Sequence, residues 1–227
     1  MAYLGAFYRT YAMDFWGFGE SGKKRETYAV SDFVSLVDQF MEQLGIIHAP
    51  LVGHSMGGTV SLSVAIRYPE RVSKVVVVGS PIVGSSLAPL LKLAGYRPIA
   101  FMLFNMMGIF RAGMRLYSPF ICRDPRFPDM MDRDLSRTTL ESFLRSIASL
   151  RRTDLTPMLS QVKVPVMGIY GDRDVIVHPL QWQPLQNGVP QAVVERFPMA
   201  GHFPMFEEPN EFSQKLKSFL DKETPTS

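Results

Sequence analysis

The sequence predicts an α/β fold in which helices flank a mainly parallel sheet, and three observations support this prediction. Apolar runs of strand length alternate along the chain with segments whose apolar residues recur at helical spacing. The run at residues 75–78 is continuously apolar, which is typical of a strand covered on both faces. Glycine-rich or turn-forming loops follow these runs, at the edge where open α/β sheets bind their ligands.

The first part of the chain fits this alternation. Residues 10–14 are predicted to form a short buried strand, and the glycine-rich stretch 15–22 is predicted to form the loop after it. We expect Ser31 to cap a helix that stops at Gly45. The apolar residues that recur at helical spacing in this helix are Phe33, Val37, Phe40, Met41 and Leu44.

The next stretch joins a strand to a helix through a serine. Residues 49–52 are a short apolar run, and residues 59–68 form a helical segment that Pro69 stops. Between them, Gly53 and Gly57 bracket Ser55. We expect a nucleophile elbow, which is a tight turn with a strained backbone. Bulky residues on either side of the serine would prevent this turn, and glycines permit it. The helix amino terminus would aim the N–H of Met56 at an oxyanion.

The later part of the chain returns to strands and helices. Apolar runs predict buried strands at 75–78, 164–170 and 192–197, and a short helix is expected at 180–185. Pro209 is expected to open a final helix before a polar tail at 221–227. Its apolar face would consist of Phe212, Leu216, Phe219 and Leu220.

One long segment lacks strand patterns. Residues 81–159 contain helical patterns and half of the chain's 14 methionines. We expect a helical insertion here, called the cap segment, over the carboxyl edge of the sheet. Residues 1–80 and 160–227 would form the core. Met and Phe side chains adapt to varied apolar ligands, although they also serve simply to pack such a segment onto a core.

A serine nucleophile needs a base and an acid that orients the base. His202 follows the last strand, which places it at the same edge as Ser55, whereas His178 and His48 are less well placed and His54 lies inside the elbow. Asp172 and Asp174 follow the preceding strand, and either could serve, although Asp174 has more room to turn inward. The order serine, acid, histidine is the one described for one hydrolase fold.

These motifs together resemble a cap-bearing serine hydrolase of the α/β-hydrolase superfamily, over residues 10–220. They are Asp14-Phe15-Trp16-Gly17-Phe18-Gly19-Glu20-Ser21, Gly53-His54-Ser55-Met56-Gly57-Gly58, Gly171-Asp172-Arg173-Asp174 and Gly201-His202. The resemblance implies that Asp174 is the acid. Serine at position 55, where related dehalogenases and epoxide hydrolases carry aspartate, argues against those activities. Pocket candidates are Trp16, His54, Pro81 and Phe203.

The sequence departs from the superfamily pattern at its amino terminus. Members usually begin with further strands and a His-Gly loop that supplies a second oxyanion donor, and no His-Gly pair precedes Ser55. We expect the amino-terminal strands to be missing, with a truncated sequence favoured over a real deletion or a partner chain. A bare sheet edge would favour association into a homodimer.

The predicted activity is hydrolysis of a carboxylic ester, or a related acyl compound that is mainly apolar, through an acyl-enzyme. Carbon–carbon bond hydrolysis, thioester hydrolysis, slow-turnover ligand binding and a catalytically impaired form remain alternatives. No metal or organic cofactor is expected. The formal charge of +3 is too small to indicate nucleic-acid binding, and no run is long enough for membrane insertion. One cysteine, Cys122, which we expect to be inert, and no visible signal peptide suggest a cytoplasmic protein.

Overall fold

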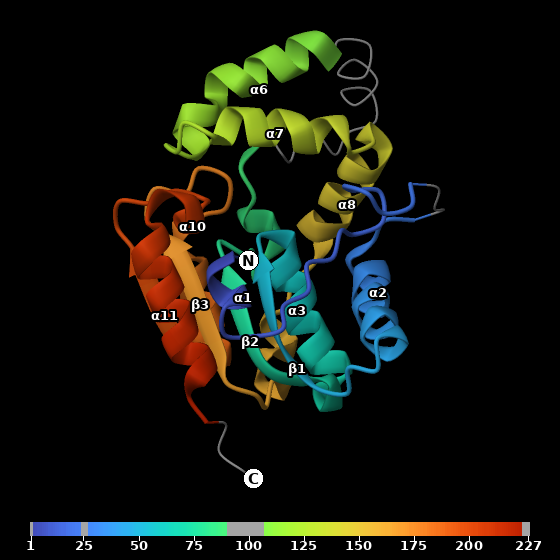
Figure 1. The fold of residues 1–227 in the computed structure, drawn as a ribbon, viewed down its shortest axis with the longest axis vertical. Coiled ribbons are helices and arrows are strands. Elements are labelled where there is room, and N and C mark those ends of the chain that lie inside the picture. Colours follow the sequence, from blue (N-terminus) through green and yellow to red (C-terminus); the bar gives the residue numbers. More distant parts are fainter. Residues whose placement is uncertain (1, 24–26, 90–106, 224–227) are drawn as a thin grey trace.

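The computed structural model describes residues 2–23, 27–89 and 107–223 (Figure 1). Its centre is a parallel sheet of four strands in the order β1-β2-β3-β4. They are β1 (Ala49–His54), β2 (Val72–Val78), β3 (Val166–Gly171) and β4 (Val193–Phe197). Because all pairs are parallel, the four carboxyl ends share one edge of the sheet. The predicted α/β class is confirmed.

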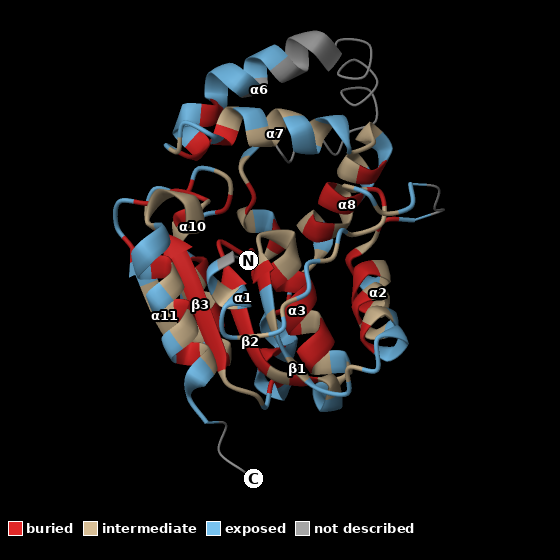
Figure 2. Ribbon diagram, in the orientation of Figure 1, coloured by how far each residue is buried: buried red, intermediate tan, exposed pale blue. Residues whose placement is uncertain are grey.

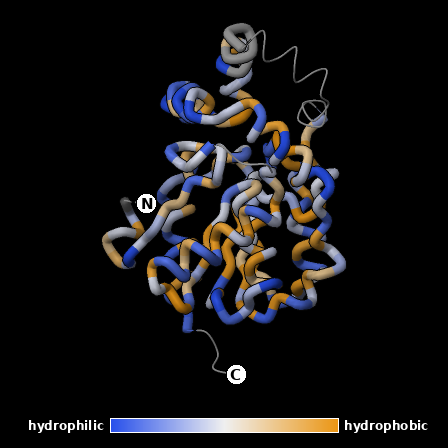
Figure 3. Tube along the Cα trace, turned by 90° about the vertical axis from the view of Figure 1, so that its right-hand side faces the viewer, coloured by the Kyte–Doolittle hydropathy of each residue, from blue (hydrophilic) through white to orange (hydrophobic). Residues whose placement is uncertain are grey.

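Helices cover both faces of the sheet, and β2 shows why its sequence is continuously apolar. Val75 and Val77 belong to a core cluster that includes residues of α2 (Val30–Gln43), α3 (Met56–Arg67) and α9 (Trp182–Gly188). Val76 and Val78 belong to a second cluster with α11 (Pro209–Asp221). The two central strands, β2 and β3, are buried along almost their whole length (Figure 2), and hydrophobic residues run through the centre of the molecule (Figure 3).

The remaining described elements of the core are short. They are α1 (Ala2–Gly5), η1 (Pro69–Arg71), η4 (Pro179–Gln181) and α10 (Pro204–Glu207), while η3 (Thr156–Gln161) spans the boundary between the cap segment and the core. The predicted helix at 180–185 is found as η4 followed by α9. The predicted final helix is confirmed as α11, which buries Phe212, Leu216 and Phe219.

The start of α2 differs from the prediction. The helix begins at Val30 with Ala29 as its N-cap, so Ser31 lies inside the helix. Asp32 takes over the capping role, because its Oδ2 accepts the main-chain N–H of Ala29 at 2.7 Å. The predicted stop is confirmed, since Gly45 follows the helix with a φ of 65°.

The predicted strand at residues 10–14 is wrong. These residues have no assigned secondary structure, and Tyr11 is 42% exposed. A strand requires the backbone of a neighbour for its ladder of hydrogen bonds. Within the described residues, β1 pairs only with β2, and no strand lies alongside 10–14.

The described part of the cap segment is helical and adds no strand to the sheet. It contains η2 (Gly84–Ser86), α6 (Met107–Ile121), α7 (Phe127–Ser136) and α8 (Leu140–Arg152). Figure 1 shows α6 and α7 beyond the carboxyl ends of the strands. A bridge between Val83 and Asp154 holds the two ends of the segment side by side. Residues 90–106 of this segment lie outside the described residues.

No helix in the described part of the chain is long and apolar enough to cross a lipid bilayer. The division into a core and a cap remains a prediction.

Candidate active site

Ser55 lies in the turn between β1 and α3, and it is the one described residue other than glycine with a positive φ, 53°. This strain is expected for a nucleophile elbow. A Cβ on Gly53 would lie 2.2 Å from the carbonyl carbon of Gly57. A Cβ on Gly58 would lie 1.9 Å from Ser80 Oγ, whereas one on Gly57 would meet nothing within 4 Å. The steric role predicted for Gly57 therefore belongs to Gly58.

His202 and Asp174 form a buried pair in the loops that follow β4 and β3. His202 Nδ1 lies 2.7 Å from Asp174 Oδ2, and the two side chains are only 4% and 3% exposed. Asp174 Oδ1 accepts the main-chain N–H groups of Ile176 at 2.8 Å and Val177 at 2.9 Å. Because a carboxylate accepts, Nδ1 of His202 donates. Its Nε2 then carries the lone pair that a general base needs.

Asp172 has a different environment. Its two carboxylate oxygens accept from Arg196, with Nε at 3.0 Å and Nη2 at 2.8 Å. This ion pair is partly open to solvent, since the Arg196 side chain is 49% exposed. The structure thus separates the two carboxylates that the sequence left as alternatives: Asp174 faces His202, and Asp172 forms a surface ion pair.

The end of β2 connects Ser55 with the His202–Asp174 pair. Ser55 N donates to Val78 O at 2.8 Å. A Cβ on the next residue, Gly79, would lie 3.1 Å from His202 Nδ1 and 3.4 Å from Asp174 Oδ2. Among the hydrogen bonds of the described residues, none joins Ser55 Oγ to His202. Such catalytic bonds are often long in the absence of substrate and tighten in the complex.

Met56 is the first residue of α3. Its N–H belongs to the first helical turn, whose donors lack acceptors inside the helix and lie at the positive end of the helix dipole. An anion beside Ser55 would therefore be stabilised there.

Other nucleophile and metal chemistries find little support in the described residues. Burial raises the pKa of the Cys122 thiol to about 11, so this cysteine is protonated at neutral pH. Within the described ranges, no group of three or more His, Cys, Asp and Glu side chains could hold a metal ion.

The four predicted pocket residues fall into two groups. Trp16 packs against the larger core cluster, and Pro81 is buried with its carbonyl accepting from Thr59 Oγ1 at 2.8 Å. His54 and Phe203 instead lie beside His202, with ring centroids 4.6 and 5.1 Å from the His202 ring. The last two therefore adjoin the candidate site directly.

Three further residues contact this region without any signal in the sequence. Glu207 Oε2 accepts from Gly201 N at 2.6 Å, and its Oε1 accepts from Arg123 N at 3.1 Å. Phe127 of α7 packs on Phe203 at 4.6 Å between centroids. Gly79 has no side chain and so leaves room for His202 and Asp174. The contacts of Glu207 and Phe127 join distant segments, so no local pattern could have identified them.

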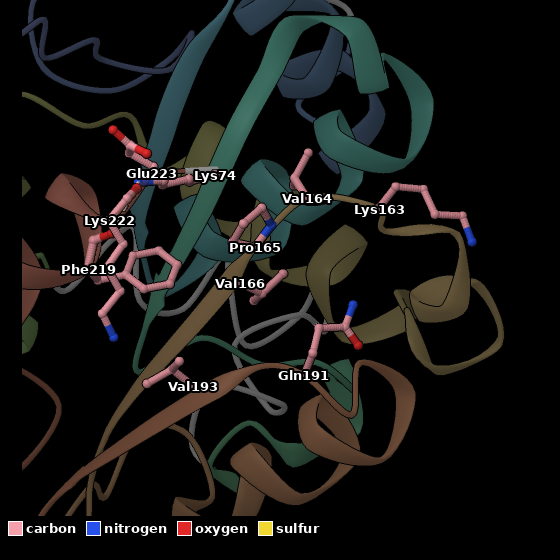
Figure 4. Close-up of a pocket in the computed structure, with 10 residues that line it drawn as sticks. All are labelled: Lys74, Lys163, Val164, Pro165, Val166, Gln191, Val193, Phe219, Lys222 and Glu223. Atoms are coloured by element: carbon pink, nitrogen blue, oxygen red, sulfur yellow. Dashed lines mark hydrogen bonds between the residues drawn. The ribbon is translucent and has the colours of Figure 1, made fainter. Parts of the chain in front are cut away.

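A cavity of about 400 Å³ lies at the opposite edge of the sheet, among residues that begin β3 and β4 (Figure 4). The buried cation there is already engaged, because Lys74 Nζ donates to the carbonyls of Phe219 at 3.2 Å and Leu220 at 2.6 Å near the end of α11. A cation at a helix carboxyl terminus stabilises that helix. We therefore interpret the residues around this cavity as serving the stability of α11, and we place the candidate site at His202.

Comparison with known proteins places this geometry in context. A model of a family described as the alpha/beta hydrolase family matches residues 1–215. A 2-hydroxy-6-oxononadienedioate/2-hydroxy-6-oxononatrienedioate hydrolase of Paraburkholderia phymatum is 31% identical over 231 residues, covering 96% of this chain and 78% of that protein. The 3-oxoadipate enol-lactonase 2 of Acinetobacter baylyi is 25% identical over 229 residues, covering 98% and 82%.

Solved structures show the same fold. A hydrolase from Pseudomonas aeruginosa superposes with a TM-score of 0.79 at 22% identity, covering 92% of this chain and 78% of that one. The alpha/beta hydrolase MGS-M2, from a deep-sea metagenome library, has a TM-score of 0.73 at 26% identity and covers 94% and 80%.

Proposed function

Because the chain belongs to the alpha/beta hydrolase family, we propose that it is a serine hydrolase that cleaves carboxylic esters, including lactones, through an acyl-enzyme. The observation that carries this proposal is the buried His202–Asp174 pair beside the strained turn of Ser55. The substrate is a small acyl compound. No cofactor is needed, since serine, histidine and aspartate supply the nucleophile, the base and the orienting acid.

In the proposed hydrolysis, His202 transfers the proton and Ser55 forms the bond to the substrate. His202 Nε2 takes the Ser55 hydroxyl proton while Ser55 Oγ bonds to the carbonyl carbon. The N–H of Met56 stabilises the oxyanion. When the carbon–oxygen bond to the leaving group breaks, His202 returns the proton to the departing alcohol. A water molecule then attacks the acyl-enzyme with His202 again as base, which releases the acid and restores Ser55.

Turnover of short p-nitrophenyl esters tests the proposal. We expect wild-type protein to release p-nitrophenolate catalytically and Ser55→Ala to abolish this release. Ser35→Ala on α2 is the matched control, because Ser35 Oγ donates within its own helix to Ser31 O. The control should keep wild-type kcat. Equal rates for wild type and Ser55→Ala would contradict the proposal.

A second candidate function is hydrolysis of a carbon–carbon bond. The observation that favours it is the 31% identity to a hydrolase whose named substrate is an oxo-dienedioate. The compound described by this name has a ketone and two carboxylates but no ester. Hydrolysis beside the ketone therefore breaks a carbon–carbon bond. The same serine, histidine and aspartate would serve this reaction.

One substrate pair separates the two functions. We would compare kcat/KM for p-nitrophenyl butyrate with that for a 2-hydroxy-6-oxo-2,4-dienoate, whose conjugated chromophore disappears on cleavage. An esterase favours the first substrate, and a carbon–carbon hydrolase favours the second. Ser55→Ala protein serves as the blank for both.

A further inference from the structure

His54 connects the nucleophile turn to the loop of the proposed base. It immediately precedes Ser55, and its Nε2 lies 2.8 Å from the main-chain oxygen of His202, a residue 148 positions away. Its ring lies 4.6 Å from the rings of both His202 and Phe203, measured between centroids. One side chain therefore contacts the backbone and the imidazole of His202 from a position next to Ser55.

The chemistry of this contact fixes the state of His54. A carbonyl oxygen can only accept, so Nε2 of His54 must carry the hydrogen. Burial, and secondly the nearness of His202, lower the pKa of His54 to about 3. At neutral pH the ring is therefore uncharged and donates steadily. A neutral His54 also avoids charge repulsion when the neighbouring His202 takes a proton.

The His202 loop is held by side chains on both flanks. Gly201 N donates to Glu207 Oε2 at 2.6 Å, and the His202 carbonyl accepts from His54. Asp174 fixes the Nδ1 side of the ring at 2.7 Å. The bond to Asp174 fixes one atom of the ring. The bond from His54 restrains the backbone from which the ring projects.

We propose that His54 is a positioning residue, whose Nε2–H bond to the His202 carbonyl holds the base at the distance from Ser55 that proton transfer requires. The proposal rests on the proposed serine-hydrolase function, in which Ser55 and His202 exchange a proton. It assigns His54 a role through His202 and not a contact with substrate. A misplacement of about 1 Å at such a site lowers rates by about 100-fold.

Two amide substitutions test the role of the donor. In His54→Gln the amide nitrogen can reach the place of Nε2, whereas in His54→Asn the same group is one carbon shorter and cannot. We expect His54→Asn to lower kcat about 10- to 100-fold with little change in KM, and His54→Gln to recover most of that loss. His178→Asn is the control and should be unaffected, because His178 is exposed and its side chain accepts from Leu180 N.

A spectroscopic readout separates this proposal from the proposed function. The His202 Nδ1 proton, shared with Asp174, should give a far-downfield proton NMR signal in wild type and His54→Gln. In His54→Asn this signal should shift or broaden. Folding of each variant is checked by circular dichroism, and if His54→Asn does not fold, His54→Gln against wild type still decides through kcat and the NMR signal.

Each outcome has one meaning. A wild-type kcat and an unchanged signal in His54→Asn would overturn the positioning role, as would equal losses of kcat and signal in the Asn and Gln variants. A wild type that hydrolyses no substrate while the signal still responds to His54→Asn would overturn the proposed function alone.

Discussion

At the scale of single residues, the two aspartates of one loop have opposite surroundings. Asp174 is almost fully buried and bonded to His202, whereas Asp172 pairs with Arg196 at the surface. Sequence spacing alone does not distinguish Asp172 from Asp174 as the acid, because it does not show in which direction each side chain of the loop points. The resemblance favoured Asp174, and the geometry supports the same choice.

This contrast leads to a matched prediction. Asp174→Asn should lower kcat by about 10³- to 10⁴-fold, because an amide in place of the carboxylate favours the wrong histidine tautomer. Asp172→Asn should leave kcat unchanged and cost at most about 1 kcal/mol of stability, since exposed ion pairs contribute little. Steady-state kinetics and urea unfolding measure the two effects. Similar losses of kcat in both variants would refute the assignment of Asp174.

His54 should also make the stability of the protein depend on pH. Its pKa falls from an ordinary 6.5 to about 3 in the folded state, so the unfolded state binds the additional proton between these values. Stability from this group is complete above pH 6.5 and is lost as pH falls toward 3. Between pH 7.5 and 5 the loss is about 2 kcal/mol.

Urea unfolding at both pH values measures this loss. Between pH 7.5 and 5 the free energy of unfolding should fall in both proteins. The fall should be about 2 kcal/mol smaller in His54→Gln than in wild type. Every other titrating group is common to the two proteins, so their contributions cancel in the comparison. Parallel pH dependences would show that His54 is not held neutral.

At the scale of elements, the loop after β4 is tied to the cap segment. Glu207 at the end of α10 accepts from Gly201 N in the His202 loop and from Arg123 N between α6 and α7. One carboxylate therefore joins the proposed base to the helices above the sheet. We infer that cap position and base position are coupled through Glu207.

Glu207→Gln tests that coupling. A glutamine has one accepting oxygen, so one of the two N–H groups loses its partner, at a cost of about 1–3 kcal/mol. We expect a lower free energy of unfolding and faster hydrogen exchange at the Gly201 or Arg123 amide. Glu211→Gln is the control, because Glu211 pairs only with Lys215 on the surface of α11 among its described contacts. Unchanged exchange at both amides would contradict the coupling.

The same scale shows what the sequence predicts well. The helix α11 and strand β2 follow directly from their apolar patterns, since each buries the face that its pattern defines. Residues 10–14 have the composition of a strand, yet they form none, because strand formation depends on a neighbour that composition does not reveal. The cap of α2 differs from the prediction for a similar reason, because Ser31 and Asp32 are both capping types and the sequence does not show which of them faces the first turn of the helix.

At the scale of the whole molecule, the two outer strands of the described sheet, β1 and β4, differ. β4 presents charged residues, with Glu195 and Arg196 both in ion pairs. β1 carries Val52, which is 46% exposed, and follows Ile47, which is 78% exposed. Charged residues blunt an edge strand, whereas apolar ones leave it available for pairing. If the predicted homodimer forms, β1 is the edge we assign to it.

Light scattering after size exclusion tests this assignment. Wild type should shift from monomer to dimer with rising concentration, and Val52→Lys should remain a monomer because a charge would be buried in the interface. Its kcat should be unchanged, since Val52 is not among the residues around His202. A wild type that stays monomeric throughout, or a lysine variant that still dimerises, would exclude β1 as the interface.

The global layout was predictable to the extent that it depends on local pattern. The alternation of strand and helix patterns predicts the parallel sheet, and the ends of the predicted strands place Ser55, Asp174 and His202 at one edge of it. Gly58, Glu207 and the His54–His202 bond depend on contacts between segments far apart in the chain, which spacing cannot reveal.

Labelling with a fluorophosphonate, followed by intact-mass and peptide mass spectrometry, tests the central claim most directly. This probe needs an activated serine but no particular substrate. We predict one adduct per chain on Ser55, no adduct in Ser55→Ala, and a much slower reaction in His202→Ala. A wild-type protein that is folded and yet unlabelled, or labelled elsewhere than Ser55, would contradict the account.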